Sequence, residues 1–301
     1  MSVYARSLCE MRNADGRRCA SLTQICANLL ARTLRFQFPS HPCSRSGLQY
    51  ASPHFPDRNV AFRNGLSLYR RTLKPDLSTK PHVVATVTQP ADLLYFFNGG
   101  TSKADVLEFR LDTLHAEIHD AFVTVVDSEY PILATARRAA EGGSLKLGDK
   151  ARIALYEQFL PEVDIVDTEI SSLRSDSFSS FPDLVTSHKA QLLGSFHDFE
   201  GYPGIETLKD KVSEAYDLGA KVAKIAVILE EMSDLFAVVD LVEHHRSEGR
   251  LISAMGMGPL GKLSRLVLAR AGSCLNYGYL QSPNAPGQWP ADDLAELIKE
   301  V

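Results

Sequence analysis

From residue 82 onward, short apolar or alternating runs are separated by longer segments in which apolar residues recur with a helical period. Runs of this length and pattern predict strands, and the longer segments predict helices. The predicted strands are 82–88, 106–112, 131–137, 164–170, 192–198, 222–228, 251–257 and 273–279. The predicted helices are 147–161, 204–219, 230–249, 261–272 and 291–301, with an earlier one opened by Asp92.

Strands that alternate with helices indicate parallel pairing through right-handed crossovers. Eight such units in about 220 residues predict a (β/α)8 barrel over residues 81–301. A doubly wound open sheet is the alternative. It would normally carry a glycine-rich turn after its first strand, and residues 86–93 contain no glycine.

The second predicted strand carries two different faces. Its sequence VLEFRLD alternates apolar and charged side chains, namely Leu107, Phe109 and Leu111 against Glu108, Arg110 and Asp112. In a barrel the apolar set faces the helices, and the charged set faces the lumen or its upper rim, where barrel enzymes place their chemistry. Buried charges must be paired or must bind something polar. The charged set is therefore either a salt-bridge cluster in the lumen or a polar floor beneath a hydroxylated substrate.

Residues 1–80 differ in charge from the rest of the chain. They contain 13 basic and four acidic residues, a net +9, whereas residues 81–301 have a net charge of −14. The acidic body argues against binding of nucleic acid. We predict that residues 1–80 form a poorly ordered extension with a short helix near 20–35. An Arg-rich, acid-poor segment is also typical of an organelle transit peptide, and a misplaced start site or a small helical cap are further interpretations.

The cysteines and the hydropathy bear on the compartment. The five cysteines form no C-x-x-C pair and no zinc spacing, which favours a reduced compartment. No apolar run approaches the roughly 18 residues of a membrane span, so no membrane association is expected. We predict a cytoplasmic location, with targeting to an organelle through residues 1–80 as the alternative.

Lys224 is the first candidate for chemistry. It lies in the sixth predicted strand on the same face as Val222, Ala226 and Ile228. Desolvation of a lysine lowers its pKa, and the neutral amine can form a Schiff base with a carbonyl substrate. The alternative is a lysine paired with a carboxylate in the lumen, such as Glu108 or Glu169.

His197 ends the neighbouring strand on its lumen face, within reach of chemistry on Lys224. A histidine there can move protons at neutral pH. Glu141 follows the third strand and could orient His197, or it could be an ordinary charge of a surface loop. His115 and His119 have a spacing that could hold a metal ion, but a surface helix is the simpler interpretation.

The loops after the last two predicted strands, GMGPLGKLSRL and SPNAPGQW, stand where barrels often bind anions. Arg265 falls in the first turns of the helix after the seventh strand. A guanidinium beside a helix start suits a carboxylate or a phosphate, and spacing alone does not choose between them.

From about Val83 to its end, the chain resembles the type I 3-dehydroquinate dehydratases of the shikimate pathway. The resemblance is carried by EFRLD, TARRAAEGG, DTEI, SFHDF, KIA, GPLGKLSRL and APGQ, which occur in this order on successive strands. It implies a barrel that needs no cofactor, forms a homodimer, and converts 3-dehydroquinate to 3-dehydroshikimate through an imine.

The resemblance also implies residue roles. Lys224 would form the imine, His197 would act as acid and base, and Glu141 would partner the histidine. The substrate's ring hydroxyls would be held by Glu108, Arg110 and Arg137, and its carboxylate by Arg265 and Gln288. Asn284 stands where the family often has serine and could still donate a hydrogen bond. A class I aldolase acting on a sugar phosphate and a catalytically inactive barrel are the competing hypotheses.

Overall fold

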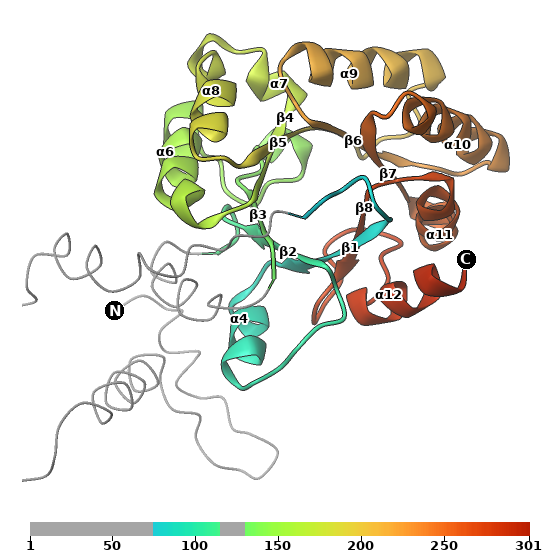
Figure 1. The fold of residues 1–301 in the computed structure, drawn as a ribbon, viewed down its shortest axis with the longest axis horizontal. Helices are drawn as coiled ribbons and strands as arrows, with labels where there is room; N and C mark the ends of the chain where they lie inside the picture. The colour runs from blue at the N-terminus through green and yellow to red at the C-terminus, as the bar shows by residue number, and fades with distance from the viewer. Residues whose placement is uncertain (1–74, 115–129) are drawn as a thin grey trace, which may run out of the picture. The chain divides into compact units, whose positions relative to one another are not determined.

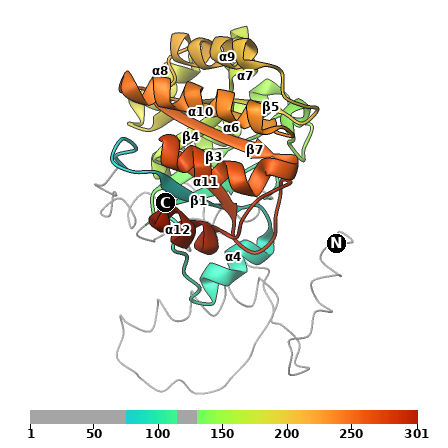
Figure 2. The same cartoon turned by 90° about the vertical axis from the view of Figure 1, so that its right-hand side faces the viewer.

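The computed structural model describes residues 75–114 and 130–301, and Figures 1 and 2 show its ribbon from two sides. Eight parallel strands are hydrogen-bonded in the order β7-β6-β5-β4-β3-β2-β1-β8. Their bounds are β1 His82–Val87, β2 Val106–Arg110, β3 Ile132–Thr135, β4 Ile165–Glu169, β5 Gln191–Asp198, β6 Val222–Ile228, β7 Leu251–Met257 and β8 Leu275–Tyr279. Each of the eight predicted strands is confirmed.

The helices lie outside the ring of strands (Figures 1 and 2). They are α4 Pro90–Phe97, α6 Asp149–Phe159, α7 Ile170–Leu173, α8 Phe181–Ser187, α9 Ile205–Asp217, α10 Met232–Ser247, α11 Gly261–Ala271 and α12 Ala291–Glu300. Short 3-10 turns occupy Ala139–Glu141, Leu160–Glu162, Asp176–Phe178 and Gly258–Leu260. Within the described residues, no helix is long and apolar enough to cross a bilayer.

The sheet is an almost closed barrel. Strand β1 pairs with both β2 and β8, so the first and last strands are neighbours, which excludes the doubly wound alternative. Between β7 and β8, the Cys274 N–H donates to the Ile252 carbonyl at 2.8 Å, and the Ser253 hydroxyl donates to the Leu275 carbonyl at 2.7 Å. A backbone hydrogen bond and the hydroxyl groups of Ser253 and Ser273 therefore join the two strands at this seam.

Two hydrophobic clusters lie on opposite faces of the strands. The outer cluster packs Leu107, Phe109 and Leu111 against the helices, as predicted. The inner cluster fills the lower lumen with alternate strand residues such as Val84 and Leu193, and Leu77 joins it. Burial of each such side chain contributes about 1.5–3 kcal/mol to folding. Above this apolar layer the lumen is lined by polar side chains, and the candidate site lies there.

Two features of the helix layer differ from the predictions. Helix α4 begins at Pro90 with Gln89 as its N-cap, and Asp92 is the third helical residue, whose carboxylate accepts the Thr88 and Gln89 N–H groups. Asp92 thus caps the helix from inside instead of opening it. Helices α7 and α8 were not predicted, because segments this short show less than two turns of periodicity. The predicted helix near 20–35 lies outside the described residues.

Candidate active site

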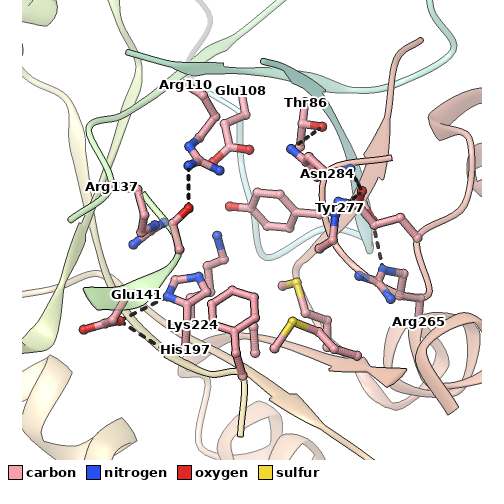
Figure 3. A pocket seen from close by; sticks show the side chains of 17 residues that line it. Thr86, Glu108, Arg110, Arg137, Glu141, His197, Lys224, Arg265, Tyr277 and Asn284 are labelled. Carbon is pink, nitrogen blue, oxygen red and sulfur yellow. Dashed lines mark hydrogen bonds and ion pairs between the residues drawn. The ribbon is translucent and has the colours of Figure 1, made fainter. Parts of the chain in front are cut away.

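A pocket opens at the carboxyl ends of the strands, where Figure 3 shows its lining. All nine side chains proposed from sequence line this one pocket: Glu108, Arg110, Arg137, Glu141, His197, Lys224, Arg265, Asn284 and Gln288. They come from β2, β5 and β6, from the segment after β3, from α11, and from the loop after β8. The barrel thus brings together residues separated by up to 180 positions in the chain.

Lys224 is buried at the centre of the site, with 4% of its surface exposed. Its Nζ lies 2.8 Å from Asp167 Oδ2 and 3.9 Å from the centroid of the Tyr277 ring. The alternative interpretation expected a pair with a lumen carboxylate, and such a pair is present, but with Asp167 and not with Glu108 or Glu169, the two examples named. Burial lowers the pKa of Lys224, and the charges of Asp167 and Glu108 oppose that shift.

Asp167 is fully buried and holds three neighbours together. Besides Lys224, it contacts Arg137 Nη2 at 2.8 Å and accepts a hydrogen bond from the Ser195 hydroxyl at 2.6 Å. Although burial opposes it, the charges of Arg137 and Lys224 lower the pKa of Asp167, so this carboxylate stays ionised. The lysine is consequently held beside a permanent negative charge.

A line of alternating charges extends from Lys224 to the helix layer. Asp167 pairs with Arg137, Arg137 Nη1 lies 3.2 Å from Glu169 Oε1, and Glu169 Oε2 pairs with Arg152 of α6. All of these side chains are at most 5% exposed. Each charge has an opposite neighbour, which compensates the desolvation that burial imposes.

His197 and Glu141 form a second pair at the rim. His197 Nδ1 lies 3.2 Å from Glu141 Oε2, and the same oxygen accepts the His197 backbone N–H at 3.1 Å. A carboxylate only accepts, so the Nδ1 atom carries the hydrogen and Nε2 offers its lone pair to the pocket. Burial, followed by the positive charges of Arg137 and Lys224, holds the pKa of His197 well below its usual range.

The loop that carries Glu141 is fixed by Asp112. Arg110 donates to both oxygens of Asp112 at 2.9 Å, and Asp112 also accepts the backbone N–H groups of Arg137 and Ser144. Of the charged set predicted for this strand, Arg110 and Asp112 thus form an ion pair, whereas Glu108 accepts the Thr135 hydroxyl at 2.8 Å. Asp112 organises the loop and does not line the pocket.

The opposite wall of the pocket is built around Arg265. Its guanidinium donates to the backbone carbonyls of Tyr277, Gly256, Gly261 and Gly287 at 2.6–3.0 Å. Burial lowers the pKa of Arg265 to about 10. No carboxylate pairs with this guanidinium anywhere in the described part of the chain, so the site carries an uncompensated buried positive charge. Such a site favours an anionic ligand group.

Gln288 and Asn284 shape the loop beside Arg265. Gln288 Oε1 accepts the backbone N–H groups of Asn284 and Ala285 at 2.8 and 3.2 Å. Its amide nitrogen is then the end left to donate to a ligand. Asn284 Nδ2 donates to the Thr86 hydroxyl at 3.3 Å, which ties the loop to β1.

Sequence reasoning missed three lumen residues, Asp167, Ser195 and Tyr277. Asp167 and Glu169 alternate in the motif DTEI, a pattern that places both carboxylates on the lumen face. Ser195 stands opposite Lys224 in the β5–β6 register. His115 and His119 lie outside the described residues, and among the described ones no three metal-ligating side chains cluster.

Known proteins resemble the chain over its barrel. A family model for type I 3-dehydroquinase matches residues 85–300. A 3-dehydroquinate dehydratase from Methanocella arvoryzae is 33% identical over 220 residues, covering 73% of this chain and 96% of that protein. The one from Shouchella clausii is 31% identical over 210 residues, covering 66% and 82%. The crystal structure of 3-dehydroquinate dehydratase from Geobacillus kaustophilus has a TM-score of 0.65 at 27% identity, covering 74% of this chain and 91% of that one.

Proposed function

Because this chain belongs to the type I 3-dehydroquinase family, we propose that it dehydrates 3-dehydroquinate through an imine on Lys224. The enzyme is a hydro-lyase of the shikimate pathway, and its product is 3-dehydroshikimate. The observation that carries the residue assignment is the position of Lys224 Nζ, which is buried between the ionised Asp167 and the His197–Glu141 pair. Membership in this family favours the dehydratase over the two competing hypotheses, a class I aldolase and a catalytically inactive barrel.

Imine formation begins when the neutral amine of Lys224 attacks the C3 ketone. Burial lowers the pKa of Lys224 and so favours the neutral form. Loss of the C3 oxygen as water then leaves a protonated imine. Asp167, which faces the ammonium at 2.8 Å, faces the iminium cation in the same place, so the positive charge keeps its counter-ion without rearrangement.

Elimination follows with His197 as the proton carrier. Nε2 takes a proton from C2, and the electron pair of the broken C–H bond moves into the iminium to give a neutral enamine. The enamine then expels the C1 hydroxyl, which leaves as water with the proton returned by the imidazolium. The lowered pKa of His197 keeps the free base neutral and makes its conjugate acid a ready donor. Hydrolysis of the conjugated imine releases the product.

Substrate binding divides between the two walls of the pocket. The substrate carboxylate would neutralise Arg265 and accept from the Gln288 amide, with Asn284 holding the loop closed on them. Glu108, with Arg110 and Arg137 beside it, would receive the ring hydroxyls. In this orientation C3 faces Lys224 and C2 faces His197.

Reduction of the imine tests this assignment. Borohydride added with 3-dehydroquinate should fix the substrate to the protein, and the mass of the intact chain should rise accordingly. Lys224→Met should abolish the adduct. His197→Ala should still form it but should release water at least about 10²-fold more slowly, measured by the ultraviolet absorbance of the conjugated product. Equal loss of adduct and elimination in His197→Ala would contradict the role given to the histidine.

We also infer a homodimer and a cytoplasmic location. Support for the dimer is the family resemblance, and support for the location is the absence of paired-cysteine motifs in the sequence. Light scattering coupled to size exclusion should give twice the 33.2 kDa mass of one chain. Mapping the mature N-terminus from cells would distinguish an intact chain from one cleaved within residues 1–80, as an organelle-targeted protein would be.

A further inference from the structure

The hydroxyl group of Tyr277 points into the pocket and takes no part in the steps above. The side chain belongs to β8 and is 3% exposed, and its oxygen has no hydrogen-bond partner among the described residues. Figure 3 shows this oxygen directed across the pocket toward the side of Glu108 and Arg110. A buried hydroxyl without a partner destabilises the fold, and phenylalanine would fill the same space without that cost. Packing therefore does not explain the oxygen.

The Tyr277 hydroxyl can donate a hydrogen bond only while it keeps its proton. Burial, followed by the negative charges of Asp167 and Glu108, raises the pKa of Tyr277 well above its usual range. The phenol is thus neutral throughout the working range of the enzyme. It is suited to donate its O–H to a ligand oxygen.

The position of the Tyr277 ring indicates which substrate oxygen its hydroxyl would contact. Lys224 Nζ lies 3.9 Å from the ring centroid, so the ring packs beneath the nitrogen that binds C3. The phenolic oxygen extends from the ring toward Glu108. The substrate carbon on that side of C3 is C4, which carries a hydroxyl group. An oxygen on C4 lies two bonds from the carbon attached to Nζ and so comes within reach of the phenol.

Glu108 supplies the complementary half of such a contact. Its carboxylate accepts the Thr135 hydroxyl through Oε1, and a carboxylate has further lone pairs to accept from a substrate hydroxyl. A hydroxyl that donates to Glu108 still has lone pairs with which to accept from a second group. We propose that the Tyr277 hydroxyl donates to the C4 hydroxyl of the substrate and, with Glu108, makes the site specific for a ketone flanked by a hydroxyl.

This inference rests on the proposed function and adds a specificity-determining residue to it. A site that pairs a donor and an acceptor with one substrate hydroxyl rejects the analogue that lacks it, because both protein groups then remain buried without partners. Discrimination against a 4-deoxy substrate should therefore depend on the oxygen of Tyr277 and not on its ring.

The test compares Tyr277→Phe with the wild type on 3-dehydroquinate and on 4-deoxy-3-dehydroquinate. With 3-dehydroquinate, the variant should raise KM about 3- to 10-fold, the range of one neutral hydrogen bond, and should change kcat less. With the 4-deoxy substrate, the two proteins should have the same KM. The thermal midpoint of the variant should equal or exceed that of the wild type, since an unpartnered hydroxyl has been removed.

Tyr216→Phe provides the matched control. The Tyr216 hydroxyl donates to the Leu251 carbonyl at 2.9 Å outside the pocket, so its loss should lower the thermal midpoint and leave KM unchanged.

An unchanged KM of Tyr277→Phe on 3-dehydroquinate, or an equal rise on both substrates, would overturn the proposal. Borohydride trapping distinguishes failure of the role given to Tyr277 from failure of the proposed imine on Lys224. If the wild type forms no adduct, the imine assignment fails, whereas an adduct with unchanged KM removes only the role of Tyr277.

Discussion

Lys224 Nζ and Asp167 Oδ2 lie 2.8 Å apart, and both side chains are buried. In the proposed mechanism, an amine that must lose its proton to react is thus held beside a carboxylate that favours the protonated form. The same carboxylate would then balance the iminium that replaces the ammonium. Asp167 would therefore disfavour deprotonation of the lysine but stabilise the cationic intermediates that follow.

Asp167→Asn should therefore change the pH profile as well as the rate. Without the negative charge, the pKa of Lys224 falls further, so the acid limb of kcat/KM should move to lower pH. The uncompensated iminium should lower kcat by about 10²-fold, as for loss of one preorganised electrostatic group. Steady-state kinetics from pH 5 to 9 would measure both effects, with the surface variant Glu206→Gln as control. If the acid limb of kcat/KM stays at the same pH, a group other than Lys224 determines it.

Glu141→Gln and Glu141→Ala should differ in effect. The glutamine oxygen can accept both His197 N–H groups that Oε2 now accepts, and its amide can donate to the Ser171 hydroxyl, which now donates to Oε1. Orientation of the imidazole is then kept, and the rate should fall less than about tenfold. Alanine removes the orientation and should cost about 10²-fold with trapping retained. Equal losses in a single-turnover assay would mean that charge, not orientation, is what Glu141 supplies.

Gln288→Glu should weaken substrate binding without unfolding the loop. The new carboxylate can still accept the Asn284 and Ala285 N–H groups, but it brings a negative charge to the wall proposed to receive the substrate carboxylate. KM should rise at least about tenfold, because like charges in a buried site repel by more than a kilocalorie per mole. Acidification should partly restore KM as the glutamate is protonated. Gln281→Glu, which adds the same charge at an exposed position of that loop, should leave KM unchanged.

The fold should lose stability as the pH falls below 6.5. His197, His82 and His245 all have pKa values lowered mainly by burial, so the unfolded chain binds protons more readily than the folded one below the ordinary histidine value of 6.5. Their contribution is complete above pH 6.5 and declines as the pH drops. Urea denaturation at pH 7.0 and 5.5 should show this decline. His197→Gln should reduce it, because one of the three buried imidazoles is then absent.

Much of this architecture follows from the sequence for a simple physical reason. Parallel barrel strands are buried on both faces, so each appears as a compact apolar run, and the period of two then places Lys224 and His197 in the lumen. The partner of Lys224 could not be read in this way. Which side chains face one another across a lumen depends on the stagger of all eight strands, and this stagger brings Asp167, not Glu169, to the amine. The four carbonyls around Arg265 likewise come from separate segments.

The line of buried charges from Arg152 to Lys224 ties the centre of the pocket to the helix layer, because each side chain in it has an oppositely charged neighbour. Arg152 does not line the pocket, yet it pairs with the same carboxylate that contacts Arg137. Loss of Arg152 would remove one partner of a buried carboxylate, so damage outside the pocket would spread to a residue proposed to hold the ligand.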